Sequence, residues 1–199
     1  MFSLSVAMLP DKGIGFQGKL PWHIKEELEV FKKNTLGKTI LMGQTTYDNL
    51  PGKLSGRDII VVSNDPDYKP DGVEVINDLI SFLKKHQDDD TEYIICGGAS
   101  IYKQSYKYCK KAYVSFIKET QCYNRDAWFT VFNMKDWNTI KVEEHMDFTY
   151  TELERKPERL TLVRFSETEL EFSDGTILRP VVGEKYDREL IEEIMKAGE

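Results

Sequence analysis

Short apolar runs alternate with amphipathic segments along most of the chain, and this alternation constrains the fold more than any other feature. The runs occupy residues 2–9, 38–43, 58–63, 73–76, 92–98, 112–118 and 160–165. Several are apolar almost throughout, which is typical of strands buried on both faces of a sheet. Helices are predicted between them at 24–35, 44–50, 78–86 and 99–108, the third capped by Asn77 or Asp78. The order predicts an α/β fold with a mostly parallel central sheet flanked by helices.

The pattern changes from about residue 137. Residues 137–145 and the run at 160–165 predict an antiparallel strand pair at the edge of the sheet. Beyond Glu167, residues 168–180 predict a hairpin with its turn at 173–175, followed by a helix at 186–198. We therefore expect one domain over residues 1–166 and a C-terminal extension of unknown role over residues 167–199.

Composition narrows the class of function. A formal net charge of −7 argues against a sequence-independent grip on nucleic acid, which needs a basic stripe. Three cysteines and three histidines in no metal-binding spacing predict reduced thiols and no metal site. The N-terminus has no basic lead, and no stretch approaches the roughly 18 apolar residues of a membrane span. We expect small-molecule chemistry in the cytoplasm, with no membrane partner.

The helix predicted at 24–35 carries one unusually placed acid. At about 100° per residue, Ile24, Leu28 and Phe31 form an apolar stripe, and Glu27 falls on that side of the helix while its acidic neighbours do not. A carboxylate directed toward an apolar wall loses hydration, which raises its pKa and suits a general acid or proton relay. The alternative is a glutamate at the edge of the stripe that bends out into water.

Two strands end in glycine directly before a predicted helix. Residues 92–98 run into Gly97 and Gly98, and residues 38–43 end at Gly43. Glycines at the carboxyl end of a buried strand let a phosphate approach the backbone beside a helix N-terminus, although a plain tight turn would also use them. The pair of junctions suggests a dinucleotide laid across strand ends, without a Walker motif or the G-x-G-x-x-G fingerprint.

Arg57 stands immediately before a buried strand. An arginine fixed at the mouth of a sheet suits bidentate capture of a carboxylate, and the alternative is a solvated cation at the strand edge.

Taken together, these segments resemble dihydrofolate reductases from residue 1 to about residue 166. The resemblance is carried by SLSVAMLPDKGIGFQGKLPWHIKEELEVFKKNTLGKTILMGQTTYDNL, LSGRDIIVVS, YIICGGASIYK and AYVSFI. It implies a dihydrofolate-reductase-like fold with an antiparallel C-terminal edge strand. The implied reaction is NADPH-dependent hydride transfer to C6 of 7,8-dihydrofolate with protonation at N5, which gives tetrahydrofolate for one-carbon metabolism and nucleotide synthesis.

The resemblance also implies roles for individual residues. Glu27 would hold the pterin and support protonation, Trp22 would order a water beside it, and Ser115 would hydrogen-bond to it. The implied substrate contacts are Val6, Ala7, Glu27, Leu28, Phe31, Leu50, Leu54, Arg57 and Cys96, with core packing an equal interpretation for Leu50 and Cys96. The implied cofactor contacts are Ala7, Ile14, Leu20, Gly43, Gln44, Thr45, Thr46, Ser63, Asn64, Gly97, Gly98, Ala99, Ser100, Ile101 and Tyr102. The loop at 13–20 resembles the mobile flap that closes over nicotinamide, and Asp126 resembles an acid that supports it.

Two departures concern the cofactor. Family members often carry basic side chains at the positions of Gln44 and Ser100 to hold the 2′-phosphate of NADPH, and here both are neutral. Use of NADH is therefore not excluded.

Two other functions stay open on sequence alone. One is a reductase of the same fold acting on another pterin-like or pyrimidine substrate, as in riboflavin synthesis. The other is a non-catalytic protein that uses the C-terminal extension as a contact surface. We expect a monomer, with a dimer formed through the extension as the alternative.

Overall fold

The computed structural model describes residues 1–118, 122–157, 162–166, 168–172 and 177–179, and the single positions 185, 187, 189 and 191. It divides into two compact units, Met1–Lys156 and Pro157–Glu199. Each unit is described by itself.

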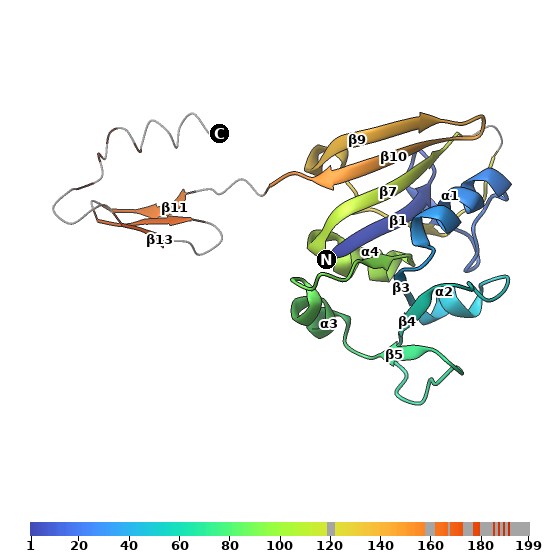
Figure 1. Ribbon diagram of the computed structural model, residues 1–199. Helices are drawn as coiled ribbons and strands as arrows, with labels where there is room; N and C mark the ends of the chain where they lie inside the picture. Colours follow the sequence, from blue (N-terminus) through green and yellow to red (C-terminus); the bar gives the residue numbers. More distant parts are fainter. Residues whose placement is uncertain are drawn as a thin grey trace. The chain divides into compact units, whose positions relative to one another are not determined.

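The first unit is built on an eight-stranded sheet in the order β5-β4-β3-β6-β1-β7-β10-β9 (Figure 1). The neighbours from β5 to β7 are parallel, whereas β10 runs antiparallel to both β7 and β9. This confirms the predicted mostly parallel α/β sheet with an antiparallel edge. The strands are β1 (Phe2–Met8), β3 (Thr39–Gly43), β4 (Asp58–Val62), β5 (Glu74–Ile76), β6 (Tyr93–Ile95), β7 (Cys109–Ile117), β9 (Trp137–Glu144) and β10 (Phe148–Arg155).

The helices lie close to their predicted positions. They are α1 (Lys25–Thr35), α2 (Gln44–Asp48), α3 (Leu79–His86) and α4 (Ala99–Ser105), the last continued by a 3₁₀ turn at Tyr106–Tyr108. A second 3₁₀ turn spans Met134–Asp136. Asp78 caps α3, because its carboxylate accepts a hydrogen bond from the Ser81 N–H at 3.0 Å. Within the described part of the chain, no helix combines the length and the apolar character needed to cross a membrane.

Strand β1 is the centre of the core. All of its residues are buried, and it pairs with β6 on one side and β7 on the other. Leu4, Leu41 and Ile95, from β1, β3 and β6, are completely or almost completely removed from solvent and belong to one apolar cluster. Burial of every residue, including Ser3 and Ser5, is expected for a strand covered on both faces.

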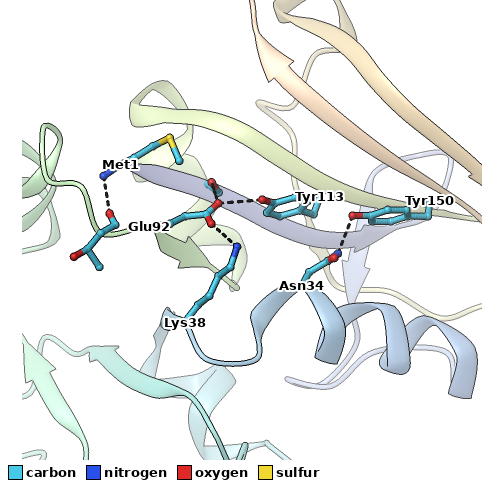
Figure 2. Close-up of polar contacts among 8 residues, drawn as sticks. Met1, Asn34, Lys38, Glu92, Tyr113 and Tyr150 are labelled. Atoms are coloured by element: carbon cyan, nitrogen blue, oxygen red, sulfur yellow. Dashed lines mark hydrogen bonds and ion pairs between the residues drawn. The ribbon is translucent and has the colours of Figure 1, made fainter.

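A polar network ties the strands together near their amino ends (Figure 2). Glu92, just before β6, accepts hydrogen bonds from Ser3 of β1 at 2.6 Å and from Tyr113 of β7 at 3.0 Å, and it forms an ion pair with Lys38 just before β3. Asn34 of α1 donates a hydrogen bond to the hydroxyl of Tyr150 on β10 at 2.9 Å. Helix α1 is thereby fastened to the sheet as well as packed on it.

One of the two strands predicted to pair at the edge of the sheet was wrong. Strand β9 begins at Trp137 as expected, but it pairs with β10 and not with residues 160–165. Strand β10 carries threonine and glutamate between its apolar residues, so it lacks the continuous apolar run that marked several inner strands. Alternation is what a half-buried antiparallel strand shows.

The run at 160–165 contributes to the second unit instead. There β11 (Leu162–Phe165), β12 (Leu170–Phe172) and β13 (Ile177–Leu178) form an antiparallel sheet in the order β11-β12-β13. The turn predicted at 173–175 and most of the helix predicted at 186–198 lie outside the described residues. The separate role expected for residues 167–199 stays a prediction.

Candidate active site

A cleft of about 1950 Å³ lies in the first unit, along the carboxyl ends of β1, β3, β4 and β6. Ligands of open α/β sheets bind at this edge, where strand ends and helix starts meet. Sites for one small ligand usually measure roughly 300–1,000 Å³. The cleft therefore has room for two ligands side by side.

Glu27 of α1 is an acid with little access to water. It is only 6% exposed, and it lines the cleft. Burial raises its pKa from the usual 4.5 to about 7, and the interaction with the Ser115 hydroxyl opposes this rise only in part. A carboxyl group that titrates near neutral pH can hold a proton or hand one on. Glu27 is thus chemically suited to proton transfer in the cleft.

Helix α1 buries polar residues and exposes apolar ones. Its two buried residues are Glu27 and Thr35, whereas Leu28 is 38% exposed and Phe31 is half-buried. Leu28 and Phe31 both line the cleft. An apolar surface left open on a helix that faces a cleft is a binding surface, because packing alone would cover it.

Two more predicted residues are buried at or near the cleft. Ser115 of β7 is buried opposite Ala7 of β1 in the parallel register, and it does not line the cleft itself. Trp22 is buried and lines the cleft, and its indole N–H has no hydrogen-bond partner among the described residues. A buried donor without a partner costs free energy, so it is expected to serve a bound water or ligand.

Arg57 is held in place by a buried hydroxyl. Its Nε donates a 2.8 Å hydrogen bond to Oγ1 of Thr35, which in turn donates to the carbonyl of Phe31 at 2.7 Å. The guanidinium also lies 5.7 Å from the centre of the Phe31 ring. Because Nε is engaged by Thr35, the terminal nitrogens are the part of the guanidinium suited to bidentate capture of a carboxylate.

The two glycine junctions meet at the middle of the cleft. The N–H of Gly43 donates to the carbonyl of Gly97 at 2.8 Å, and Gly97 has a φ of +114°, which favours glycine. A Cβ added to Gly98 would lie 3.1 Å from Oγ1 of Thr46. A side chain here would fill the narrow passage between α2 and α4. The residues present therefore fit a group, such as a pyrophosphate, that must approach the backbone closely.

The loop at 13–20 is fastened to a second segment. Strand β2 (Gly13–Gly15) pairs with β8 (Ala127–Trp128), and the Gln17 N–H donates to the carboxylate of Asp126 at 2.9 Å. The Asp126 N–H donates to the carbonyl of Gly15 at 2.9 Å. Ile14 and Leu20 of this loop line the cleft, the first buried and the second 45% exposed. Asp126 is thus placed to support the loop.

The structure brings nearly all the predicted site residues to this one cleft. Those that line it are Val6, Ala7, Ile14, Leu20, Trp22, Glu27, Leu28, Phe31, Gly43, Gln44, Thr45, Thr46, Leu50, Leu54, Arg57, Ser63, Asn64, Cys96, Gly97, Gly98, Ala99, Ser100, Ile101 and Tyr102. Ser115 reaches it only through Glu27. Burial raises the pKa of the Cys96 thiol to about 12, so this side chain contributes a neutral wall.

Sequence reasoning missed Thr35 and Asp65. Thr35 positions Arg57, and its signal was its place one helical turn after Phe31 on the same side of α1. Asp65 lines the cleft just after Ser63 and Asn64, where a charged residue at the end of a buried strand could have been noticed.

Comparisons with known proteins agree on one family. A family profile described as dihydrofolate reductase matches residues 1–157. A dihydrofolate reductase of Mycoplasma genitalium is 41% identical over 118 residues, which cover 57% of this chain and 74% of the relative. A type 3 dihydrofolate reductase of Salmonella typhimurium is 31% identical over 145 residues, covering 73% of this chain and 88% of the relative.

Solved structures point the same way. A dihydrofolate reductase of Enterococcus faecalis, complexed with NADP(H) and RAB-propyl, matches with a TM-score of 0.68 and 25% identity. The match covers 79% of this chain and 97% of that one. Family profile, relatives and fold agree: the chain belongs to the dihydrofolate reductase family and is an oxidoreductase.

Proposed function

We propose that the cleft carries out the reduction of 7,8-dihydrofolate to tetrahydrofolate by NADPH, with Glu27 as its acid. The observation that carries this assignment is the burial of Glu27, the ionisable side chain of α1 whose pKa is brought to about 7 inside the cleft. A pterin ring presents an amino group and a ring N–H that a carboxylate can bind together. A carboxyl group with this pKa also supports protonation at N5 near neutral pH.

The substrate is bound between Glu27 and Arg57. The pterin ring packs against Val6 and Ala7, and Leu28, Phe31, Leu50 and Leu54 enclose the benzoyl group. Arg57, fixed by Thr35, captures the carboxylate of the glutamate tail. Trp22 orders a water beside Glu27 through its unpaired N–H, and Ser115 holds the carboxyl from the other side.

The cofactor is bound across the strand ends. NADPH supplies the hydride when it is bound. Ala7, Ile14 and Leu20 enclose the nicotinamide beside the pterin. Gly43, Gly97 and Gly98 let the pyrophosphate approach the backbone, together with Thr45, Thr46, Ala99 and Ser100 at the starts of α2 and α4. Gln44, Ser63, Asn64, Ile101 and Tyr102 surround the adenosine half.

The loop at 13–20 excludes water from the reacting rings. Its pairing with residues 126–128 gives it a defined closed position, and its glycines allow it to leave that position. The protein thus contributes orientation of two flat rings, exclusion of water and a proton held at Glu27.

Consumption of NADPH, followed by absorbance with dihydrofolate as the second substrate, tests this function. Turnover that requires both compounds supports it, and no turnover with dihydrofolate contradicts it. A reductase for another pterin-like or pyrimidine substrate would oxidise NADPH only with that compound. A protein that acts solely as an assembly partner would show no turnover with any of them.

We further propose a monomeric protein in the cytoplasm, in which residues 167–199 serve as an extension of the catalytic domain. Light scattering of the full chain and of a chain that ends at residue 166 tests whether the extension sets the oligomeric state. A measured molar mass equal to that of one chain for both proteins supports the monomer. A mass of two chains for the full-length protein alone supports a dimer formed through the extension.

A further inference from the structure

Charge is distributed unevenly along the cleft. The lysines, arginine and histidine that line the cleft are Lys19, His23, Lys32, Lys53 and Arg57, and all of them come from the loop at 13–20, from α1 and its approach, or from residues 50–57. Among the described residues, those that line the cleft within 43–49, 62–65, 77–79 and 96–104 include no lysine, arginine or histidine. This second part of the cleft is the half to which the proposed function assigns the adenosine of the cofactor.

Neutral side chains at this end are already joined to one another. The Ser63 hydroxyl donates to Oε1 of Gln44 at 2.7 Å and accepts from the N–H of Asp65 at 3.0 Å. The Asn77 amide donates to the carbonyl of Ser63 at 2.8 Å. These bonds fix Gln44 beside Ser63 and leave its amide N–H groups as neutral donors.

The charged side chains that line this end, among the described residues, are negative. They are Asp48, Asp65 and Asp78. Asp78 accepts hydrogen bonds from the hydroxyl and the N–H of Ser81, and these bonds lower the pKa of its carboxyl. Asp65 Oδ1 accepts from the N–H of Asp67 at 2.9 Å. Its other carboxylate oxygen keeps its capacity to accept a hydrogen bond.

A ribose 2′-hydroxyl and a 2′-phosphate need opposite surroundings. The phosphate carries close to two negative charges and is held by arginine or lysine, whereas the hydroxyl is a neutral donor that an acidic residue can accept from. Neutral donors flanked by carboxylates therefore suit the hydroxyl, and they give the phosphate no counter-charge. The preference for a 2′-hydroxyl over a 2′-phosphate is therefore set by Gln44, Asp65 and Ser100.

We propose that the adenosine end of the cleft accepts a dinucleotide with an unmodified 2′-hydroxyl, so that NADH replaces NADPH in this protein without a large loss of efficiency. The proposal rests on the proposed function, because it takes the segments after β3, β4 and β6 to hold the adenosine. It concerns the choice of cofactor, whereas the proposed function concerns the reaction.

Binding and turnover test it together. Binding is measured by calorimetric titration of 2′,5′-ADP and of 5′-AMP into the full chain. The two compounds differ only in the 2′-phosphate. The assay for turnover compares kcat/KM for NADPH and NADH at one concentration of dihydrofolate. We expect the ratio of dissociation constants and the ratio of kcat/KM each to favour the phosphorylated compound by less than about tenfold, because no described lysine, arginine or histidine lines the cleft at this end. A preference of about tenfold or more in both measurements would overturn the proposal.

Charge variants identify the residues responsible. Gln44→Arg should raise the preference for NADPH by at least about tenfold, chiefly by lowering its KM, because it supplies the missing cation. Asp65→Asn should shift the preference in the same direction by a smaller factor, since it removes an exposed and partly screened charge. Gln87→Arg, which adds the same charge on an exposed position outside the cleft, is the matched control. If Gln44→Arg and Gln87→Arg change the preference alike, the assignment of Gln44 is wrong.

Failure of the proposed function would give a different result from failure of this proposal. If neither cofactor is oxidised when dihydrofolate is present, the reaction is misassigned. The 2′,5′-ADP and 5′-AMP titrations still measure the choice at the 2′-position in that case.

Discussion

Arg57 and Thr35 form a hydrogen bond of 2.8 Å from the guanidinium Nε to a hydroxyl that is completely buried. The Thr35 hydroxyl is fixed in turn by its own bond to the carbonyl of Phe31. The orientation of the arginine is therefore set by a residue that does not line the cleft. Thr35 is a positioning residue for the proposed carboxylate site.

Thr35→Val should raise KM for dihydrofolate by about tenfold with little change in kcat, because it keeps the shape of the side chain but frees the guanidinium. Steady-state kinetics measure the change, and Thr35→Ser, which keeps the hydroxyl, should behave much like the parent protein. A dihydropterin without the glutamate tail makes no contact with Arg57, so its KM should not respond. An equal rise for both substrates would show that Thr35 acts only on stability.

Gly98→Ala should weaken binding of NADPH by at least about tenfold, because the added Cβ would lie 3.1 Å from Oγ1 of Thr46 and fill the passage at the strand ends. Fluorescence titration with NADPH measures the dissociation constant. Gly52→Ala is the control, since a Cβ there meets no atom of the described residues within 4 Å. Unchanged affinity in Gly98→Ala would remove the glycine pair from the cofactor site.

Glu92→Gln should lower the free energy of unfolding at pH 7 by about 1–3 kcal/mol, because it breaks the ion pair with Lys38 at the centre of the network in Figure 2. Burial alone would raise the pKa of Glu92, but bonds from Lys38, Ser3 and Tyr113 outweigh it and lower that pKa. The stabilisation is therefore present above pH 4.5 and is lost as the pH falls below that value.

Urea unfolding of the parent protein and of Glu92→Gln at several pH values measures this difference. The two free energies of unfolding should converge as the pH falls below 4.5. A constant difference across the acid range would mean that the Glu92 charge is not what stabilises the strands.

Glu27→Gln should stabilise the protein at alkaline pH. The pKa of Glu27 is 4.5 unfolded and about 7 folded, so the parent protein loses stability as the pH rises through this window. The Glu27→Gln protein has no such loss. Above pH 7 its free energy of unfolding should exceed that of the parent protein by on the order of 2–3 kcal/mol. Thermal or urea unfolding at pH 4.5 and pH 8 compares the two proteins. Equal stability at pH 8 would mean that Glu27 is not held in a desolvated position.

The inner strands could be predicted because each carries a short stretch rich in apolar residues. Strand β1, in which Ser3 and Ser5 are buried together with the apolar residues, is one example. Strand β10 was missed because Thr149, Glu152 and Glu154 interrupt it, and the partner of β9 was then sought further along the chain. Pairing partners depend on contacts between distant segments, which a local pattern does not contain.

A residue of the candidate site could be predicted where its own position in the local pattern is unusual. Helix geometry selected Glu27 among three neighbouring acids, and the structure buries it while Glu26 and Glu29 are exposed. Thr35 could not be found in this way, because its importance lies in a bond to Arg57 from a different element. The support of the loop by Asp126 likewise depends on a contact across more than one hundred residues.

Turnover of Glu27→Gln against pH tests the central claim most directly. The parent protein should lose kcat/KM as the pH rises above about 7, where the proton held at Glu27 is lost. The variant should bind NADPH within about twofold of the parent yet turn over at least about a hundredfold more slowly at pH 7, with the deficit growing at higher pH, where protonated substrate is scarce. Near-normal turnover by the variant across neutral and alkaline pH would contradict the assignment of Glu27.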